Sequence, residues 1–278
     1  MMIDKDIISS RQNADIIAAV KLSDKKARRE SGLFRFDGLK LAREAIEKGV
    51  SLERIFVRAS SLDPIVCELQ GLDPHCRITA VTDPVFDKLS EEKSPEGIIC
   101  IAKHLDNLRK IVKINKEVRE FSDGKRVFLA ESVRDPGNLG TLIRSANALG
   151  CERMILSSDC ADPYNPRSLR AAMGALFCTE ICFADSMPDA ISALCENKRR
   201  VFAAALDKNA VKLGSFDISP LDCFVVGNEG HGLSPETVAA STQSVYIPMR
   251  AGAESLNAAT AASIILWEQE RCALFCSR

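Results

Sequence analysis

Two glycine-bearing loops near the C-terminus limit most strongly what this chain can fold into. The first, Gly227 to Gly232, holds three glycines within six residues and follows the apolar run Phe224–Val226. The second carries Gly252, follows Tyr246-Ile247-Pro248, and ends where a long Ala-, Ile- and Leu-rich helix is expected after Asn257. Glycine permits positive φ and lets a ligand approach the main chain closely. Because each loop follows a strand-like run, the pair predicts a ligand site in an open α/β sheet rather than two plain turns.

The common nucleotide-binding fingerprints do not occur in this sequence. The glycines of the first loop follow the order Gly-x-x-Gly-x-Gly, which differs from the dinucleotide fingerprint, and no Gly-x-x-x-x-Gly-Lys-Ser/Thr occurs. A nucleotide-binding oxidoreductase therefore has no support from a motif. Taken alone, the loop at Gly227 could still be an ordinary strand-to-helix turn.

The length and composition are those of a globular protein. At 278 residues the chain is long enough for two domains, and 46% hydrophobic with 27% charged residues is an ordinary balance. The start has no signal-like apolar run, and no stretch could span a membrane. The eleven cysteines are scattered without close Cys-x-x-Cys pairs. We expect reduced thiols in a cytoplasmic protein, with no bound metal and no membrane partner.

A net charge of −1 argues against a uniformly basic surface, so nucleic-acid binding would have to come from local patches. Two basic clusters qualify, Lys21 to Arg29 and Arg109 to Lys116. Clusters of this kind are more often just a solvated helix face.

Alternating strand-like and helix-like segments predict two α/β domains. Residues 1–30 look helical, with Asn13 as the cap, and the following units form a small α/β/α sandwich that ends near residue 103. Residues 104–121 are charged, contain no Gly or Pro, and are interpreted as a linker. Residues 122–278 repeat β-α units, which predicts a mostly parallel sheet with helices on both faces.

One helix of the second domain carries several polar residues of interest. It follows the chain-breaking Asp135-Pro136-Gly137, and we expect Asn138 to be its N-cap. Arg144 lies on the same helix.

Three islands of sequence resemble the three motifs of the SpoU (TrmH-like) RNA ribose 2′-O-methyltransferases, a family of the SPOUT superfamily. They match in order and spacing over residues 126–278, and the first domain is similar to the family's N-terminal substrate-binding domain. The islands are Asn138-Leu-Gly140-Thr-Leu-Ile-Arg144, Gly227-Asn-Glu229-Gly230-His-Gly232-Leu and Ile247-Pro-Met followed by Ser255-Leu-Asn257; the N-terminal similarity rests on Ser10–Asn13, Phe36-Asp-Gly38 and Pro95–Ile98.

The resemblance implies a fold, a cofactor and an assembly. It implies an N-terminal L30e-like α/β domain and a C-terminal SPOUT α/β/α domain with a deep trefoil knot, a rare exception among folds. It further implies a homodimer through the knotted domain and S-adenosylmethionine as cofactor. By position, the cofactor-binding residues would be Gly227, Asn228, Gly230, Ile247, Met249 and Leu256.

The resemblance also implies a division of chemical roles. Methyl transfer needs the methyl group and the ribose oxygen held in line, which is mainly positioning. Arg144 would assist the 2′-hydroxyl, and stabilising the developing alkoxide is easier for a guanidinium than acting as a base. The other implied catalytic residues are Asn138, Glu229, Ser255 and Asn257; the proposed RNA contacts are Arg170, Lys25, Lys26, Arg28 and Arg29.

The implied function is methyl transfer from S-adenosylmethionine to a ribose 2′-hydroxyl of structured RNA. The L30e-like domain favours ribosomal RNA over tRNA. Two alternatives stay open: a tRNA 2′-O-methyltransferase, and a non-catalytic RNA-binding or ribosome-assembly factor of the same fold.

Overall fold

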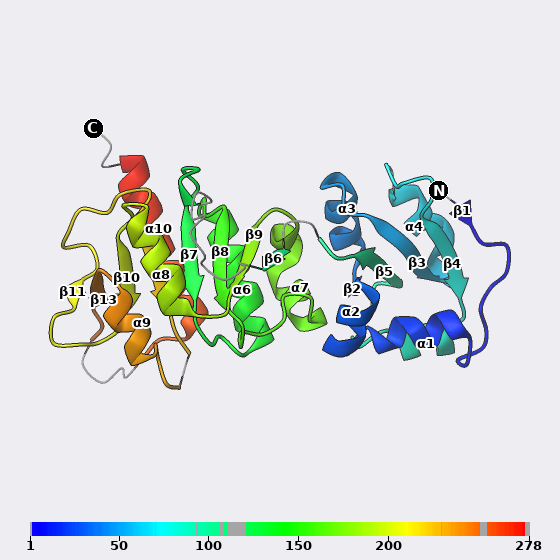
Figure 1. The fold of residues 1–278 in the computed structure, drawn as a ribbon. Coiled ribbons are helices and arrows are strands. Elements are labelled where there is room, and N and C mark those ends of the chain that lie inside the picture. Colours follow the sequence, from blue (N-terminus) through cyan, green and yellow to red (C-terminus); the bar gives the residue numbers. More distant parts are fainter. Residues whose placement is uncertain are drawn as a thin grey trace. The chain divides into compact units, whose positions relative to one another are not determined.

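The computed structural model describes residues 2–69, 71–92, 94–105, 108–110 (backbone only), 121–228, 230–250 and 255–275. Its contacts divide the chain into two compact units (Figure 1). Unit 1 comprises residues 1–106 together with Tyr164–Phe177, and unit 2 comprises the remaining residues. Each unit has its own sheet, so each is described separately.

Unit 1 is built on a mixed five-stranded sheet with the order β1-β4-β3-β5-β2. Strands β1, β4 and β3 run parallel, whereas β5 is antiparallel to both β3 and β2. The strands are β1 (Met2–Ile3), β2 (Leu33–Asp37), β3 (Leu52–Arg58), β4 (Arg77–Val81) and β5 (Ile98–Lys103). The helices are α1 (Ala14–Lys21), α2 (Lys25–Ser31), α3 (Leu39–Glu47), α4 (Leu62–Glu68), α5 (Asp83–Leu89) and, from the later segment, α7 (Pro166–Ala172), with short 3-10 turns η1 (Ala59–Ser61) and η3 (Met173–Phe177).

The N-terminal stretch is less helical than its sequence indicates. The predicted cap at Asn13 is confirmed, since its Oδ1 accepts a hydrogen bond from the Asp15 amide at 2.9 Å. The first residues, however, form an edge strand, and helix begins only at Ala14. That strand adds to the sheet because Met2 and Asp4 donate backbone hydrogen bonds to β4 and the residue before it.

The segment Tyr164–Phe177 packs on unit 1 although it lies far along the chain. The Tyr164 ring stacks on His104 with centroids 4.4 Å apart and lies 4.6 Å from the Phe34 ring. Phe177 contacts Phe36 at 5.8 Å. Phe34 and Phe36 belong to β2, an edge strand, and α7 packs against that strand. Covering an edge in this way removes a row of unpaired backbone groups from solvent.

The sequence predicts that Tyr164–Phe177 belongs to the second domain, whereas in the structure this segment packs in unit 1. A glycine helps to bring it close, because a Cβ on Gly174 would lie 2.1 Å from Glu44 Oε2. An ion pair adds to the contact, since Arg170 Nε lies 2.9 Å from Glu92 Oε1. The predicted linker falls mostly outside the described residues.

Unit 2 is built on an eight-stranded sheet with the order β11-β13-β10-β12-β7-β8-β9-β6, in which every described pairing is parallel. The predicted α/β architecture with a parallel sheet is thereby confirmed. The strands are β6 (Leu108–Lys110), β7 (Val127–Ala130), β8 (Arg153–Ser157), β9 (Glu180–Ala184), β10 (Val201–Ala204), β11 (Val211–Lys212), β12 (Cys223–Val226) and β13 (Gln243–Tyr246).

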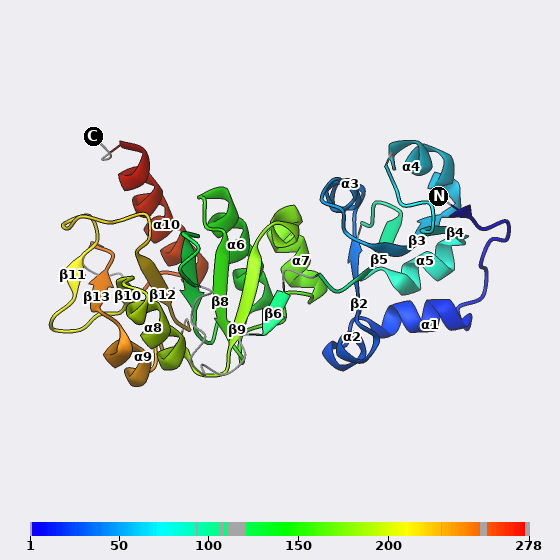
Figure 2. The same cartoon turned by 45° about the horizontal axis from the view of Figure 1, so that its top comes forward.

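The described residues of unit 2 also form the helices α6 (Pro136–Ala148), α8 (Met187–Glu196), α9 (Pro235–Ala240) and α10 (Ala258–Phe275). Helix α6 packs with α10, and α8 packs with α9 (Figure 2). The central strands are buried along their whole length, as expected of parallel strands covered on both faces. Val127 and Leu129 of β7 join the core that includes α8, so the alternating Phe128 faces the other side of the sheet.

The start of α6 corrects one prediction. Asp135, not Asn138, is the N-cap, because Asp135 Oδ1 accepts a hydrogen bond from the Asn138 amide at 2.9 Å. Asn138 is therefore the third residue of the helix. Within the described residues, no helix is both long enough and apolar enough to cross a membrane.

Removing the hydroxyl oxygen of Tyr164 tests how the segment Tyr164–Phe177 is attached to the rest of unit 1. The Tyr164 hydroxyl accepts a hydrogen bond from the Leu105 amide at 2.6 Å, and Tyr164 is only 6% exposed. Tyr164→Phe should leave that amide unsatisfied and destabilise unit 1 by about 1–2 kcal/mol. Hydrogen exchange of the α7 and β2 amides should accelerate accordingly.

The chain's other tyrosine provides the control, since Tyr246 lies in unit 2. Tyr246→Phe should leave exchange in α7 unchanged. Equal α7 exchange in the wild type and Tyr164→Phe would contradict the proposed attachment.

Candidate functional site

A cavity of about 750 Å³ lies at the carboxyl ends of three neighbouring strands in unit 2. The loops after β10, β12 and β13 form its walls, together with α9 and the start of α10. The carboxyl edge of a parallel sheet is where ligands bind in open α/β folds. The topology therefore brings together segments that are separate in the sequence.

The residues that the resemblance assigns to the cofactor lie together. All six line this one cavity: Gly227, Asn228, Gly230, Ile247, Met249 and Leu256. Ser255 of the implied catalytic set lines it as well. Glu229 lies outside the described residues.

The cavity also contains residues that sequence reasoning missed. Leu206 and Asp207, in the loop after β10, line it, and Leu206 is 74% exposed despite its apolar side chain. A sequence signal for them exists, because Val201–Ala205 is an apolar, strand-like run, and the loop after a parallel strand lies at the carboxyl edge of the sheet.

Gly227 is required by the close return of its own loop. A Cβ at this position would lie 2.4 Å from Gly232 C and 2.6 Å from Leu233 N, and both are backbone atoms. The loop closes through two backbone hydrogen bonds, Asn228 N to Gly232 O at 3.1 Å and Gly232 N to Asn228 O at 2.9 Å. Gly232 has φ +69°, which glycine adopts without strain. A side chain at position 227 would thus collide with the loop itself.

The Asn228 side chain fixes the loop from inside. Its Oδ1 accepts hydrogen bonds from the amides of Gly230 at 2.8 Å and His231 at 3.2 Å. Its Nδ2 donates to Ser132 O at 2.9 Å, in the loop after β7. The side chain therefore serves to hold the cavity wall in place.

A buried carboxylate, also missed from the sequence, anchors the adjacent helix α9. Glu131 is 8% exposed and follows β7 directly. Its Oε2 accepts from the Ser234 amide at 2.8 Å, and its Oε1 accepts from Ser234 Oγ at 2.9 Å and Thr237 Oγ1 at 2.6 Å. The sequence signal for Glu131 is an acidic residue placed directly after an apolar, strand-like run. Glu131 fixes the start of α9, where Pro235 and Val238 line the cavity.

Two residues of the implied catalytic set touch each other. Asn257 Nδ2 donates to Asn138 Oδ1 at 2.9 Å across 119 positions of sequence. Asn257 Oδ1 accepts from the amides of Ala259 at 2.9 Å and Thr260 at 3.3 Å, so it also caps α10. The Asn257 side chain thus caps α10 and also orients the side-chain amide of Asn138.

Arg144 is set apart from these residues. It is exposed on α6, six positions after Asn138, which places it about 120° around the helix. Among the described residues it has no ion pair or side-chain hydrogen bond, and the cavity lining does not include it. In the part of the chain that the structure describes, Arg144 does not line the cavity.

The structure buries one of the predicted RNA contacts and leaves the others exposed to solvent. Arg28 is only 2% exposed, and its Nη1 donates to the carbonyl oxygens of Leu22 and Ser23, both at 2.8 Å. Its guanidinium closes the end of α1, so the prediction that Arg28 contacts RNA is corrected. Lys25, Lys26 and Arg29 are exposed on the same helix, and Arg170 keeps 49% of its side chain exposed beside Glu92. The second basic cluster lies almost entirely outside the described residues.

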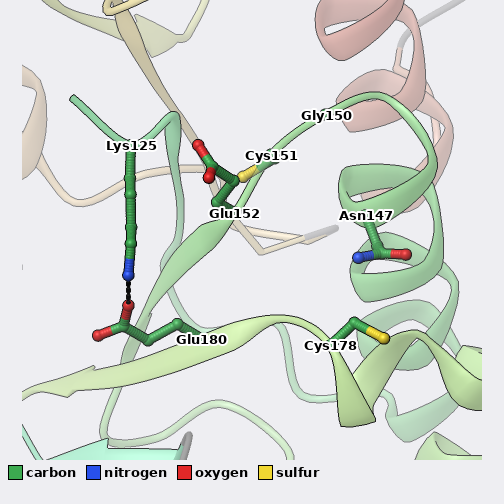
Figure 3. A pocket seen from close by; sticks show the side chains of 7 residues that line it. All are labelled: Lys125, Asn147, Gly150, Cys151, Glu152, Cys178 and Glu180. Atoms are coloured by element: carbon green, nitrogen blue, oxygen red, sulfur yellow. Dashed lines mark hydrogen bonds and ion pairs between the residues drawn. The ribbon is translucent and has the colours of Figure 1, made fainter. Parts of the chain in front are cut away.

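A second, polar cavity of about 410 Å³ holds none of the predicted site residues (Figure 3). Lys125 Nζ reaches Glu180 Oε2 at 2.8 Å, and Arg153 Nη2 donates to the same oxygen at 3.1 Å. Burial raises the pKa of the Cys151 thiol to about 12, so it stays protonated. Arg153 Nη2 also donates to Asp123 Oδ2 at 2.7 Å, so the two cations face two carboxylates, which is typical of a structural network. The described residues contain no cluster of three or more His, Cys, Asp or Glu placed to hold a metal ion.

Comparison with known proteins agrees with this geometry. Residues 125–267 match the SpoU rRNA Methylase family, and residues 13–100 match an MRM3-like substrate binding domain. The 23S rRNA (guanosine(2553)-2'-O)-methyltransferase RlmP of Bacillus subtilis is 27% identical over 260 residues, covering 94% of this chain and 97% of that protein. The human mitochondrial rRNA methyltransferase 3 is 26% identical, covering 96% of this chain and 74% of that protein.

Solved structures resemble the whole chain as well. The crystal structure of an AdoMet-bound rRNA methyltransferase from Sinorhizobium meliloti is 26% identical, with a TM-score of 0.79, covering 97% of this chain and 98% of that one. An RNA 2'-O ribose methyltransferase is 25% identical with a TM-score of 0.80. The methylase match alone spans more than half of the sequence and includes the three loops of the cavity. The chain therefore belongs to the SpoU rRNA methylase family.

Proposed function

We propose that this protein transfers a methyl group from S-adenosylmethionine to a ribose 2′-hydroxyl of ribosomal RNA. The observation that carries the proposal is the convergence of six motif residues on one cavity at the carboxyl edge of a parallel sheet. Two relatives that cover nearly the whole chain, the Bacillus subtilis and human proteins, are named as rRNA methyltransferases, which favours ribosomal RNA over tRNA.

The cavity fits a cofactor of this kind. Its volume of about 750 Å³ lies within the range of small-molecule sites. Leu206, Ile247 and Leu256 offer apolar contact for a purine ring, and the tight loop at Gly227 leaves backbone groups accessible for its polar edge. Asp207 and Ser255 provide polar groups on the same cavity for the ribose and amino-acid parts.

The mechanism follows from what the chain's own residues can do. When bound, S-adenosylmethionine supplies an activated methyl group, so the protein must orient the ribose oxygen and stabilise its developing charge. The linked amides of Asn138 and Asn257 are suited to orient the RNA ribose at the start of α10. Arg144 provides the fixed positive charge for the alkoxide, because guanidinium remains protonated at neutral pH. We assign Glu229 to the same orienting set on the strength of the family motif.

We further propose that a second copy completes the site. Arg144 projects from α6, which packs with α10, and α10 carries a row of exposed apolar side chains. These are Ile264, Trp267, Leu274 and Phe275, with exposures of 36%, 51%, 61% and 68%. A homodimer through these two helices would bury the row and bring Arg144 of one copy to the cavity of the other.

The trefoil knot expected from the resemblance remains part of the proposal. Strand β13 pairs with β10, whereas α10 packs on α6 at the other side of β12. The chain must therefore cross back between Tyr246 and Ala258. Gln269 Nε2 then donates to Pro220 O at 3.2 Å and Asp222 O at 2.8 Å, which ties α10 to the segment that enters β12. We place the protein in the cytoplasm, since the described cysteines are free thiols.

A methyl group added at position 227 should weaken cofactor binding strongly. Gly227→Ala should weaken binding of S-adenosylmethionine on the order of a hundredfold or more, because the loop must open to accept a Cβ. Isothermal titration calorimetry measures the change. Gly230→Ala is the matched variant, since its Cβ would lie 3.4 Å from Asn228 Oδ1 and should cost only a few-fold. Wild-type affinity in Gly227→Ala would place the ligand elsewhere.

Removing the charge at position 144 should affect catalysis without affecting cofactor binding. Arg144→Ala should lower the rate of methyl transfer on the order of 10²–10⁴-fold. Arg144→Lys should recover little, because an ammonium cannot reproduce the planar guanidinium. Single-turnover transfer of labelled methyl, at saturating RNA and cofactor, separates chemistry from binding. A near wild-type rate for Arg144→Ala would assign the arginine a structural role.

Mixing two inactive variants tests the shared site. In a mixed dimer, the Arg144→Ala chain offers an intact cavity and the Gly227→Ala chain offers an intact arginine. If the site is shared, a statistical mixture should recover about a quarter of the wild-type activity, because half of the dimers are mixed and each has one complete site. The separate variants, subunit-exchanged with themselves, are the controls. No recovery, with exchange verified by mass spectrometry, would show that Arg144 acts within its own chain.

A further inference from the structure

The loop after β7 contains a residue in an unfavourable backbone conformation. Ser132 has φ +56°, a left-handed value that few residues other than glycine adopt. It follows Glu131, whose carboxylate anchors α9, and it precedes the motif helix α6. Backbone strain of this kind persists only where neighbouring groups hold it.

Two side chains from the end of β8 hold Ser132. The Ser132 amide donates to Ser157 Oγ at 2.8 Å, and the Ser132 hydroxyl donates to Asp159 Oδ2 at 2.7 Å. Ser157 Oγ in turn donates to Asp159 Oδ1 at 2.6 Å. Both carboxylate oxygens of Asp159 therefore act on the same strained residue, one directly and one through Ser157.

Ser132 in turn holds the wall of the cavity in place. Its carbonyl oxygen accepts the hydrogen bond from Asn228 Nδ2 at 2.9 Å. The left-handed conformation directs that carbonyl, and Asn228 Oδ1 then fixes the amides of Gly230 and His231. A continuous series of hydrogen bonds thus leads from Asp159 to the glycine loop.

We propose that Asp159 is a positioning residue for the cofactor: it holds Ser132 in the left-handed conformation that directs Asn228 and so keeps the loop Gly227–Gly232 in its binding shape. This inference rests on the proposed function, since it takes the cavity as the S-adenosylmethionine site. Asp159 acts through Ser132 and Asn228 and does not line the cavity itself.

The surroundings of Asp159 suit a positioning role better than a core-packing role. Its side chain is 43% exposed, so removing it leaves no buried void. Partial burial alone would raise the pKa of Asp159, but hydrogen bonds from Ser157, Arg134 and Ser132 outweigh it and lower the pKa to about 2. The carboxylate is accordingly ionised throughout the physiological range. Arg134 Nη2, at 2.9 Å from Oδ2, adds a charged partner on the solvent side.

Calorimetry on the full chain, with S-adenosylmethionine as the probe, tests the series of hydrogen bonds from Asp159 to the glycine loop. Asp159→Ala should weaken binding about tenfold, whereas Glu196→Ala, which removes an exposed carboxylate at the end of α8, should not. Ser132→Gly should bind nearly as wild type, because glycine adopts the left-handed conformation without a tether. In the Ser132→Gly background, Asp159→Ala should then have little further effect. Additive losses, or an unchanged affinity in Asp159→Ala, would overturn the inference.

Hydrogen exchange of the ligand-free protein provides a readout that does not depend on the proposed function. The Gly230 and His231 amides should exchange about tenfold faster in Asp159→Ala, and slow exchange should return in the double variant with Ser132→Gly. Unchanged exchange at these amides would overturn the inference even if the wild type binds the cofactor. A wild type that binds no S-adenosylmethionine, with exchange at the loop still dependent on Asp159, would instead contradict the proposed function alone.

Discussion

The close return of the loop Gly227–Gly232 on itself is the constraint on which the candidate site depends. The backbone at position 227 lies so near Gly232 and Leu233 that no side chain fits between them. Two side chains hold the surroundings of that loop: Asn228 fixes it internally, and Glu131 fixes the helix that follows it. Because two backbone segments lie this close, position 227 does not accept a larger residue. Substitutions that alter ligand binding are therefore expected at the outer lining of the cavity.

Much of this cavity could be predicted from local sequence, because its signals are local. A strand-like run that ends in glycines marks the edge of a parallel sheet, and the family motifs that the sequence resembles fall on that edge. The match to the SpoU family confirms the recognition. Leu206 and Asp207 carry no motif, and only the sheet order, with β10 between β12 and β13, shows that their loop shares the cavity.

The predictions that the structure corrects depend on contacts that a pattern does not encode. Asp135 and Asn138 are both good capping residues three positions apart, and the backbone conformation at Asp135 decides between them. Arg28 lies in a basic cluster that looks solvated, yet its guanidinium satisfies two carbonyls at the end of α1. Such burial of a charged group follows from the turn between two helices, which composition cannot reveal.

The packing of Tyr164–Phe177 on unit 1 has a consequence for how the gene can be divided. The polypeptide passes between the two units at residues 106/107, 163/164 and 177/178, whereas two domains in simple succession are joined once. No single cut in the coding sequence therefore separates one unit completely from the other. A fragment that begins after residue 121 would carry α7 and Tyr164 without the strand that buries them. Replacing unit 1 of this chain by recombination or fusion would thus require the exchange of two segments, residues 1–106 and Tyr164–Phe177.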